Sequence, residues 1–261
     1  MRWCIALLWL VLAAPVLACG LEDPCKLGDR SYHLRVPNGW DGTSPLPVLL
    51  HFHGWGRQGD LIVNHQRIAG ATRRRGVLLV APNGLGRSWD FRRADSRDIA
   101  FARAVLDDVR RLYPVDEGRI YVSGYSWGSN MAWRFVCEDG ADVAALLGIS
   151  GVLPQDTDCA TAPGEIRQVY GLRDEVLPFP AGPGGDETWP VKLWRDRLSC
   201  GAGRDAGDWQ QVSFLTLARR EWTRCARGRV TLDLHPGGHF IPHGWIARQL
   251  DEMLGLPPSY P

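Results

Sequence analysis

The chain of 261 residues lacks a charge excess of either sign, since 30 Lys and Arg residues stand against 29 Asp and Glu residues. Proteins that bind nucleic acid or another polyanion usually carry a strongly basic surface. The densest positive cluster, Arg73–Arg75, is only three residues long and is typical of a solvated surface. The sequence therefore predicts no nucleic-acid partner.

Fingerprints of cofactor binding are also missing. The sequence contains neither the glycine-rich motif that binds dinucleotides nor the Gly-Lys-Ser/Thr loop that binds phosphates. His235, His239 and His243 have a helical spacing, but the prolines and glycines between them disfavour a continuous helix. His51 and His53 lack a carboxylate pattern that would complete a metal site. We therefore predict an activity that needs no cofactor and no metal.

Long apolar runs are confined to the N-terminus. After Met1 and Arg2, residues 4–17 are almost wholly apolar, and Val-Leu-Ala at 16–18 is typical of a cleavage site. This run is shorter than the roughly 20 residues that span a bilayer. We predict a signal peptide over residues 1–18 and one catalytic domain over 19–261. The mature protein should be secreted or periplasmic, with no transmembrane segment after cleavage.

Cysteine usage supports export. Removing the leader leaves six of the seven cysteines, and an even number suits three disulfides in an oxidising compartment. Pairing in sequence order, one of fifteen connectivities, gives Cys19–Cys25, Cys137–Cys159 and Cys200–Cys225. The alternative is a lipoprotein, because Val-Leu-Ala-Cys resembles a lipidation box. Lipid on Cys19 would leave five cysteines, so we favour the disulfides.

Strand-like and helix-like segments alternate along the chain. Residues 46–52 and 76–82 are short apolar runs typical of buried parallel strands, and 31–37 alternates like a half-buried edge strand. Residues 96–114 form the clearest amphipathic helix. Further helices are predicted at 61–76, 129–140, 187–200 and 244–254, and further strands at 119–124, 143–150, 166–172 and 229–235. The pattern predicts a single-domain α/β fold with a mainly parallel central sheet and helices on both faces.

The segment Gly-Tyr-Ser-Trp-Gly at 124–128 follows a predicted strand and precedes a predicted helix. At a sharp strand-to-helix turn, small residues at both ends let the serine hydroxyl project from the sheet edge. Ser126 is therefore the candidate nucleophile. The alternative is a purely structural turn.

A serine nucleophile needs a base and an orienting acid, which follow it in this arrangement in the order acid, histidine. Asp174 comes just after the predicted strand 166–172, and His239 lies in a glycine-rich turn after the strand 229–235. Both are at carboxyl ends of strands, where ligands bind in open α/β sheets. His243 is the reserve base. Glu175 is expected to point elsewhere.

An oxyanion hole is predicted from two backbone amides. The segment His-Gly-Trp-Gly at 53–56 follows an early strand, and its glycines leave the amide of Trp55 exposed. The amide of Trp127 begins the helix after the nucleophile. His53 is expected to brace the loop. Asp205 and Asp208 are weaker candidates for the acid, because they lie in a predicted loop with no strand to position them.

With these pieces assembled, the chain resembles the α/β-hydrolase superfamily and, more narrowly, secreted polyhydroxybutyrate depolymerase-like and feruloyl esterase-like serine esterases. The resemblance covers nearly the whole mature chain and is most specific over residues 98–133; it also rests on "LPVLLHFHGWG", "YGLRDEVLPF" and "HPGGHFIPHGW". It implies Ser126 as nucleophile, Asp174 as orienting acid and His239 as base. Bridges near Cys137–Cys159 and Cys200–Cys225 fit those of such enzymes.

Departures from this resemblance touch the rim of the site. Trp127 replaces the small residue that often follows the nucleophile, Glu175 replaces a frequent proline, and Phe-Ile-Pro at 240–242 replaces Thr-Trp-Pro. Trp55, Trp89 and Trp127 are predicted to form an aromatic substrate surface, with ordinary packing as the alternative.

The resemblance implies an ester substrate, either a polyhydroxyalkanoate-type polyester or the feruloyl and acetyl esters of plant polysaccharide. Two other functions stay open. One is a non-catalytic protein of the same fold that binds polysaccharide, and the other is a peptidase on this fold.

Overall fold

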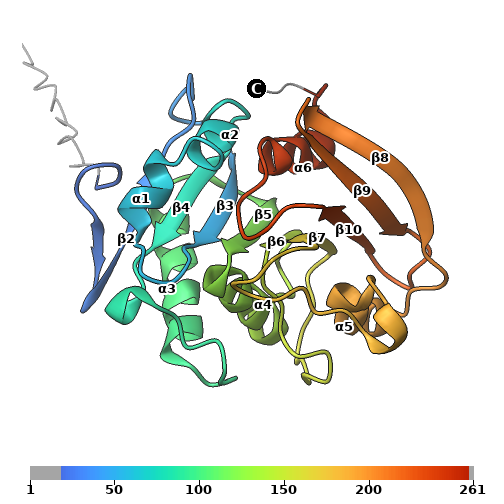
Figure 1. Cartoon of the computed structure of the whole chain (residues 1–261). Coiled ribbons are helices and arrows are strands. Elements are labelled where there is room, and N and C mark those ends of the chain that lie inside the picture. Colours follow the sequence, from blue (N-terminus) through green and yellow to red (C-terminus); the bar gives the residue numbers. More distant parts are fainter. Residues whose placement is uncertain (1–18, 259–261) are drawn as a thin grey trace, which may run out of the picture.

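The structure is a computed structural model that describes residues 19–258; the predicted leader, residues 1–18, lies outside the described residues. Its backbone is organised around one sheet (Figure 1), in which the described strands follow the order β1-β2-β4-β3-β5-β6-β7-β10-β9-β8. The strands are β1 (Cys25–Leu27), β2 (Arg30–Arg35), β3 (Leu46–Phe52), β4 (Leu78–Pro82), β5 (Val115–Tyr125), β6 (Ala145–Ile149), β7 (Glu165–Gly171), β8 (Arg204–Val212), β9 (Leu215–Trp222) and β10 (Arg229–His235).

The centre of the sheet is parallel and its edges are antiparallel. Strands β4, β3, β5, β6, β7 and β10 pair in parallel, whereas β1 and β2 on one side and β9 and β8 on the other pair antiparallel. The predicted mainly parallel sheet is confirmed. Because parallel strands end at the same edge, the loops after β3, β5, β7 and β10 meet there.

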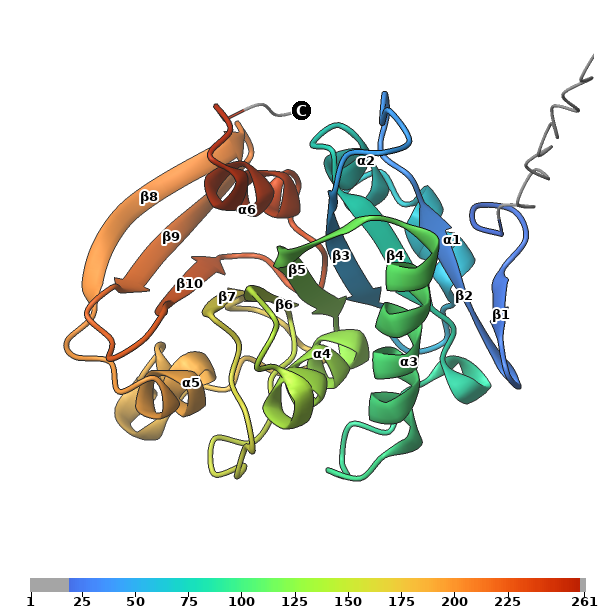
Figure 2. The same ribbon diagram turned by 180° about the vertical axis from the view of Figure 1, so that it is seen from behind.

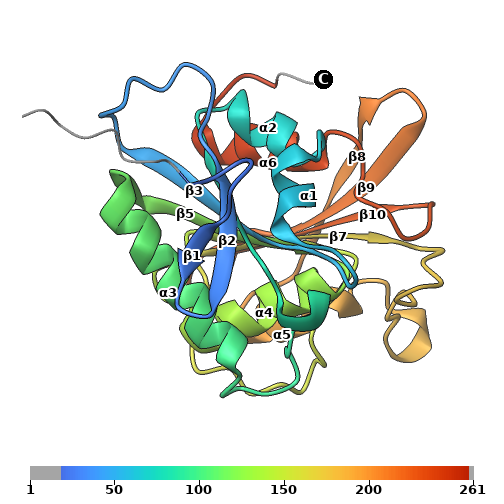
Figure 3. The same ribbon diagram turned by 90° about the vertical axis from the view of Figure 1, so that its left-hand side faces the viewer.

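Helices cover both faces of the sheet, as predicted (Figure 3). α1 (Gly59–Asn64), α2 (Ala69–Arg73) and α6 (Trp245–Leu254) lie on one face, and α3 (Arg97–Leu112), α4 (Trp127–Asp139) and α5 (Lys192–Arg197) lie on the other. Short 3₁₀ turns are η1 (Leu85–Arg87), η2 (Pro183–Gly185) and η3 (Trp189–Val191). Within residues 19–258 no helix combines the length and apolarity needed to cross a bilayer.

Alternation along β3 illustrates how the two cores form. Leu50 and Phe52 point into the core beneath α3, α4 and α5, while Leu49 between them points into the core beneath α1, α2 and α6. Successive side chains of a strand face opposite sides, so a run that is apolar at every position is buried on both faces. This is why the continuous apolar runs marked the central strands correctly.

The polar stretch after residue 200, predicted as a loop, is instead the antiparallel hairpin β8–β9, and that prediction was wrong. The hairpin extends the sheet beyond β10 (Figure 2), and Asp205 and Asp208 lie in β8. Trp209, Leu215 and Leu217 are buried in the core beneath α6, and Trp222 is buried in the core on the other face. Most of the other hairpin positions are exposed or half-buried and polar, so the composition alone resembled a loop.

Two predicted helices are shorter than expected. The segment 61–76 divides into α1 and α2, because His65 adopts an extended conformation at the end of α1. Ile62 before this break and Ile68 after it are both buried against the sheet. The segment 187–200 likewise contains a 3₁₀ turn, η3, before α5.

The disulfides Cys19–Cys25, Cys137–Cys159 and Cys200–Cys225 are all formed, which confirms the sequential pairing. The sulfur of Cys19 is engaged in its bridge, so it is not free to carry a lipid. The second bridge connects α4 to the segment before β7. The third bridge connects the segment before β8 to the segment after β9 and so joins the two ends of the hairpin.

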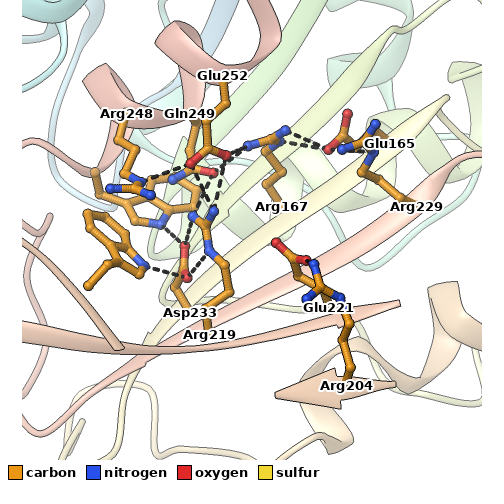
Figure 4. Close-up of polar contacts among 12 residues, drawn as sticks. Glu165, Arg167, Arg204, Arg219, Glu221, Arg229, Asp233, Arg248, Gln249 and Glu252 are labelled. Atoms are coloured by element: carbon orange, nitrogen blue, oxygen red, sulfur yellow. Dashed lines mark hydrogen bonds and ion pairs between the residues drawn. The ribbon is translucent and has the colours of Figure 1, made fainter. Parts of the chain in front are cut away.

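A cluster of buried polar groups fixes the hairpin and α6 to the central sheet (Figure 4). Asp233 of β10 accepts hydrogen bonds from the Arg219 guanidinium of β9 at 2.8 and 2.9 Å. The indoles of Trp209 and Trp245 donate to the same carboxylate at 2.9 and 2.8 Å. Glu252 of α6 accepts from Arg219 at 2.9 Å. We call this set the hairpin network.

Candidate active site

Ser126 lies in the sharp turn between β5 and α4, as predicted. Its backbone has φ 59° and ψ −125°, a conformation that non-glycine residues adopt at an energetic cost and that is common at functional sites. A Cβ on Gly124 would lie 2.0 Å from the Gly128 carbonyl oxygen, and one on Gly128 would lie 2.0 Å from that of Phe52. Both glycines are therefore required by the backbone packing around Ser126.

Asp174 and His239, 65 residues apart, are in direct contact. Nδ1 of His239 lies 2.6 Å from Oδ2 of Asp174, whose carboxylate is fully buried. The other oxygen accepts hydrogen bonds from the amides of Val176 and Leu177, both at 3.0 Å. These amides hold the carboxylate in place, so it orients the imidazole through Nδ1–H. Glu175 is exposed, as expected.

Tyr125 connects the nucleophile turn to the histidine loop. Its hydroxyl donates to the His239 carbonyl oxygen at 3.0 Å, and the two rings pack with centroids 4.9 Å apart. Burial raises the pKa of the Tyr125 hydroxyl to about 12, so it stays a donor at neutral pH. Among residues 19–258, no hydrogen bond joins Ser126 to His239. Such bonds are often long without substrate and tighten when it binds.

The predicted oxyanion loop packs directly against this turn. A Cβ on Gly54 would lie 3.6 Å from Cβ of Ser126. The amide of Trp127 is the first of α4 and has no carbonyl one turn earlier to pair with. The Trp55 amide belongs to the loop beside it. Both candidate donors are thus carried by segments that border Ser126.

His53 braces the loop, as predicted. Its Nδ1–H donates to the Gly54 carbonyl at 2.9 Å, and its Nε2 accepts from the Gly84 amide at 3.0 Å. Burial lowers the pKa of His53 to about 4. A neutral imidazole with both nitrogens occupied is not available as a base.

Two further buried histidines, His51 and His235, also have structural hydrogen bonds. Nδ1 of His51 pairs with the Ser123 hydroxyl at 2.7 Å, and Nδ1 of His235 accepts from the Gly237 amide at 3.1 Å. Burial lowers the pKa of His51 to about 3 and that of His235 to about 4. Of these imidazoles, only His239 has a carboxylate on Nδ1.

His243, the reserve base, is occupied by a different partner. The guanidinium of Arg67 donates to its Nε2 at 2.7 Å and to the Ile241 carbonyl at 2.5 Å. These bonds hold the histidine loop from the side of α1. In the part of the chain that the structure describes, no three His, Cys, Asp or Glu side chains gather as metal ligands.

Two cavities flank the Ser126 turn. The aliphatic cavity, about 420 Å³, is bordered by Leu61, Ile62, Tyr125, Ile241 and Gly54 together with more polar groups. The arginine cavity, about 450 Å³, has lining residues that include Leu85, Trp89, Arg92 and Trp127. Each cavity thus includes one chain neighbour of Ser126, Tyr125 in the first and Trp127 in the second.

The three tryptophans of the predicted aromatic surface have different surroundings. Trp55 is 67% exposed and packs edge-on against Trp127, with centroids 6.4 Å apart. Trp89 is only 3% exposed, and its indole donates to the His53 carbonyl at 2.8 Å, so most of it is packing. Trp89 is also one of the residues that line the arginine cavity, and its role in substrate binding stays a prediction.

Sequence reasoning missed Tyr125, Arg67, Phe91 and Arg92. Tyr125 occupies a variable position of the serine motif. Only the size of its side chain suggested that it could contact the loop that carries His239. Arg67 comes from the break between α1 and α2 and had no motif. Phe91 packs on Trp127 at 5.5 Å between centroids, a contact between distant segments that no local pattern indicates.

The parallel sheet, the sharp serine turn after β5 and the pairing of Asp174 with His239 after β7 and β10 define the α/β-hydrolase fold, and this chain adopts it. The sequence is similar to esterases. It is 28% identical over 173 residues to feruloyl esterase C of Emericella nidulans, covering 64% of this chain and 62% of that protein. It is 26% identical over 178 residues to the bifunctional acetylxylan esterase/xylanase XynS20E of Neocallimastix patriciarum, covering 67% of this chain and 25% of that protein.

The structure superposes on the acetyl xylan esterase from Aspergillus awamori with a TM-score of 0.62 and 13% identity, over 87% of this chain and 94% of that one. This likeness concerns the fold. No protein-family model matches the chain. The chain spans about three-fifths of the length of the feruloyl esterases it matches.

Proposed function

We propose that the protein is a serine hydrolase that cleaves carboxylic esters through an acyl-enzyme. The observation that carries the proposal is the 2.6 Å contact between Asp174 and His239 at the sheet edge where the strained turn presents Ser126. The similarity to feruloyl and acetylxylan esterases supports an ester rather than an amide as substrate.

In the proposed reaction, the Ser126 hydroxyl attacks the ester carbonyl carbon while His239 Nε2 takes its proton. The negative oxygen that develops is stabilised by the amides of Trp55 and Trp127. Loss of one such donor typically costs about 3 kcal/mol of transition-state stabilisation. The tetrahedral intermediate then collapses, and the histidine returns the proton to the departing alcohol.

Water completes the cycle. It attacks the acyl-serine carbonyl, His239 accepts a proton from it, and Ser126 leaves as the free hydroxyl with that proton. Asp174 orients the imidazole and stabilises its charged form in both steps. The proposed chemistry uses only side chains and amides of this chain.

The substrate class within this proposal follows the relatives' printed names, which are feruloyl esterase and acetylxylan esterase. Feruloyl or acetyl esters of plant polysaccharide are therefore the first substrates to test, with polyhydroxyalkanoate-type polyester as the next. Polysaccharide binding without catalysis and peptide hydrolysis remain the alternatives. The contact between Asp174 and His239 favours catalysis over the first of them, since binding alone does not require it.

We also propose that the protein is exported. Three disulfides among residues 19–258 support an oxidising compartment. Mass spectrometry of the mature N-terminus tests this proposal, and we expect a chain that begins near Cys19 and carries no lipid.

The test of the activity uses the wild-type protein, Ser126→Ala and Ser213→Ala. Ser213 is an exposed serine at the turn of the β8–β9 hairpin and serves as the matched control. We expect short para-nitrophenyl esters to be cleaved, and a fluorophosphonate probe to label the wild type and Ser213→Ala but not Ser126→Ala. A folded Ser126→Ala protein that hydrolyses esters normally would contradict the assigned nucleophile. Labelling together with activity on peptide amides but not esters would favour a peptidase.

A further inference from the structure

The arginine cavity beside Trp127 combines cationic and aromatic groups. Besides hydrophobic residues it is bordered by Arg92, Arg93, Arg97, Asp90 and Asp98. The aliphatic cavity is instead lined by Leu61, Ile62 and Ile241, with Arg57 as its one arginine and no carboxylate. The two cavities beside the Ser126 turn therefore differ in charge and in apolar character.

Both aspartates of this cavity are already engaged. The buried carboxylate of Asp98 forms an ion pair with Arg30 at 2.7 Å through one oxygen and accepts from the Asp90 amide at 2.7 Å through the other. Asp90 lies 3.6 Å from the guanidinium of Arg93. The negative charges are thus directed at protein groups and oppose a bound anion only weakly.

Two of the three arginines also have carboxylate partners. Arg93 lies 3.2 Å from Asp95, and Arg97 lies 3.5 Å from Asp29. These are exposed pairs, so each is worth little in stability. They nevertheless offset the charges of Arg93 and Arg97 locally.

Arg92 differs from both. Among residues 19–258 it forms no ion pair; its guanidinium instead lies over the rings of Trp127 and Phe91, 5.4 and 5.1 Å from their centroids. Among the described residues the Arg92 guanidinium makes no hydrogen bond either, so its N–H groups are available. Those groups match the geometry of a carboxylate, which they can bind in bidentate fashion.

We propose that Arg92, supported by Trp127 and Phe91, forms an anion subsite that selects esters carrying a second, free carboxylate. The inference rests on the proposed esterase function, because Trp127 follows the nucleophile directly. A carboxylate on Arg92 would position the scissile carbonyl of the same molecule near Ser126. The free carboxylate belongs either to the acid or to the alcohol portion of the ester.

Two pairs of substrates separate these portions. On the acid side, mono-para-nitrophenyl adipate is compared with para-nitrophenyl pentanoate. On the alcohol side, para-butanoyloxybenzoate is compared with its neutral methyl ester. For each ester, the ratio of kcat/KM in a variant to that in the wild type cancels differences in leaving-group reactivity.

The variants are Arg92→Gln and, as matched control, Arg93→Gln, which removes the same charge from the neighbouring position, where carboxylates already offset it. We expect Arg92→Gln to lower kcat/KM about tenfold, or about 1.4 kcal/mol, for the anionic member of at least one pair. Its neutral partner should change less than about twofold, and Arg93→Gln should leave the ratio of anionic to neutral esters near that of the wild type.

Three results would overturn the subsite. One is an equal loss for anionic and neutral esters in Arg92→Gln. Another is an equal selective loss in both variants, which would indicate a general field of positive charge. The third is no selective loss at all, which would make Arg92 an ordinary solvated arginine.

A binding measurement keeps this inference distinct from the esterase proposal. In Ser126→Ala protein, para-butoxybenzoate and its methyl ester are titrated by calorimetry. We expect the carboxylate to bind more tightly than the methyl ester, and Arg92→Gln to abolish that preference. Such binding without hydrolysis in the wild type would retain the subsite while rejecting the esterase, whereas hydrolysis without any carboxylate preference would do the reverse.

Discussion

The same two strands carry two polar clusters with opposite properties. Within β7 and β10, Arg167 and Asp233 point towards α6 and belong to the hairpin network or its margin (Figure 4). Just beyond the ends of these strands, Asp174 and His239 form the candidate catalytic pair. The clusters are built from similar groups, yet the first is surrounded by hydrogen-bonding neighbours, whereas His239 in the second has one ring nitrogen that makes no hydrogen bond among residues 19–258.

The two clusters differ in how many of their hydrogen-bonding atoms are already paired within the protein. In the hairpin network, four N–H groups donate to the Asp233 carboxylate, and Glu252 accepts from Arg167, Arg219 and Arg248. At the site, Asp174 is equally well satisfied, but among residues 19–258 the second nitrogen of His239 makes no hydrogen bond. A polar group inside a strand forms its hydrogen bonds with adjacent strands and helices. A polar group in the loop after a strand can keep a donor or acceptor unpaired, and that atom is available to a ligand.

The sharpest test of this comparison is Asp174→Asn. The amide group would favour the wrong imidazole tautomer, so we expect kcat for ester hydrolysis to fall about 10⁴-fold. Stability should change far less than activity. Steady-state kinetics together with thermal unfolding measure both quantities, and a normal kcat in a folded variant would reject the role of Asp174.

The converse change, Asp233→Asn, should affect stability instead. The change removes one of the two carboxylates that pair with the buried Arg219 and leaves only Glu252, so we expect a loss of about 3 kcal/mol in the free energy of unfolding. The kcat per folded molecule should stay within about twofold of the wild type. Urea unfolding and active-site titration test this prediction. A stable variant with low kcat would mean that the two clusters are coupled.

Acid should weaken the two regions in different pH windows. The pKa values of His51, His53 and His235 are lowered by burial to about 3, 4 and 4. Their unfolded forms take up protons below about pH 6.5, so folded stability is complete above that pH and falls as pH drops towards 4. Each group contributes up to about 1.4 kcal/mol per pH unit.

The hairpin network responds at lower pH. Burial raises the pKa of Glu252, but the charges of Arg219 and Arg167 outweigh it, so the net pKa is lowered. The stability from this group is present above the unfolded pKa and is lost as pH falls through the folded one. Urea unfolding across pH 3–7 should show both windows, and His51→Gln should reduce the slope only in the upper one. An unchanged slope there would contradict the assignment.

The smallest expected effect comes from Tyr125→Phe. The variant loses the hydrogen bond to the His239 carbonyl, worth about 1 kcal/mol, and we expect kcat to fall about fivefold at unchanged KM. Tyr113→Phe, far from the site on the loop after α3, is the control and should leave kcat unchanged. A change in KM alone would assign Tyr125 to substrate binding instead.

Local patterns predicted the central fold, and they singled out Ser126, Asp174 and His239, whose catalytic roles stay a proposal. The apolar runs 46–52 and 76–82 became β3 and β4, and the glycines around Ser126 marked the serine turn. These features depend on periodicity and on backbone crowding, which neighbouring residues determine. The hairpin β8–β9 was missed because its strands alternate buried and exposed residues at a sheet edge, where polar residues outnumber apolar ones.

Contacts between distant segments could not be derived in the same way. The placement of Arg92 over Trp127 depends on how the loops after β4 and β5 come together, and that of Arg67 depends on how the segment between α1 and α2 meets the loop after β10. Neither arginine belongs to a motif. The contacts of each arginine are made with residues that are distant in the sequence, so they can be identified only from the folded structure.

The sequence by itself determined the order of strands and helices, the serine turn, the six cysteines and the positions of Asp174 and His239 at strand ends, because these follow from local chemistry and spacing. The tertiary structure alone decided which polar groups have all their hydrogen-bonding atoms paired and which keep one unpaired. The reason is physical: whether a polar side chain keeps an unpaired hydrogen-bond donor or acceptor depends on which other segments of the chain pack against it.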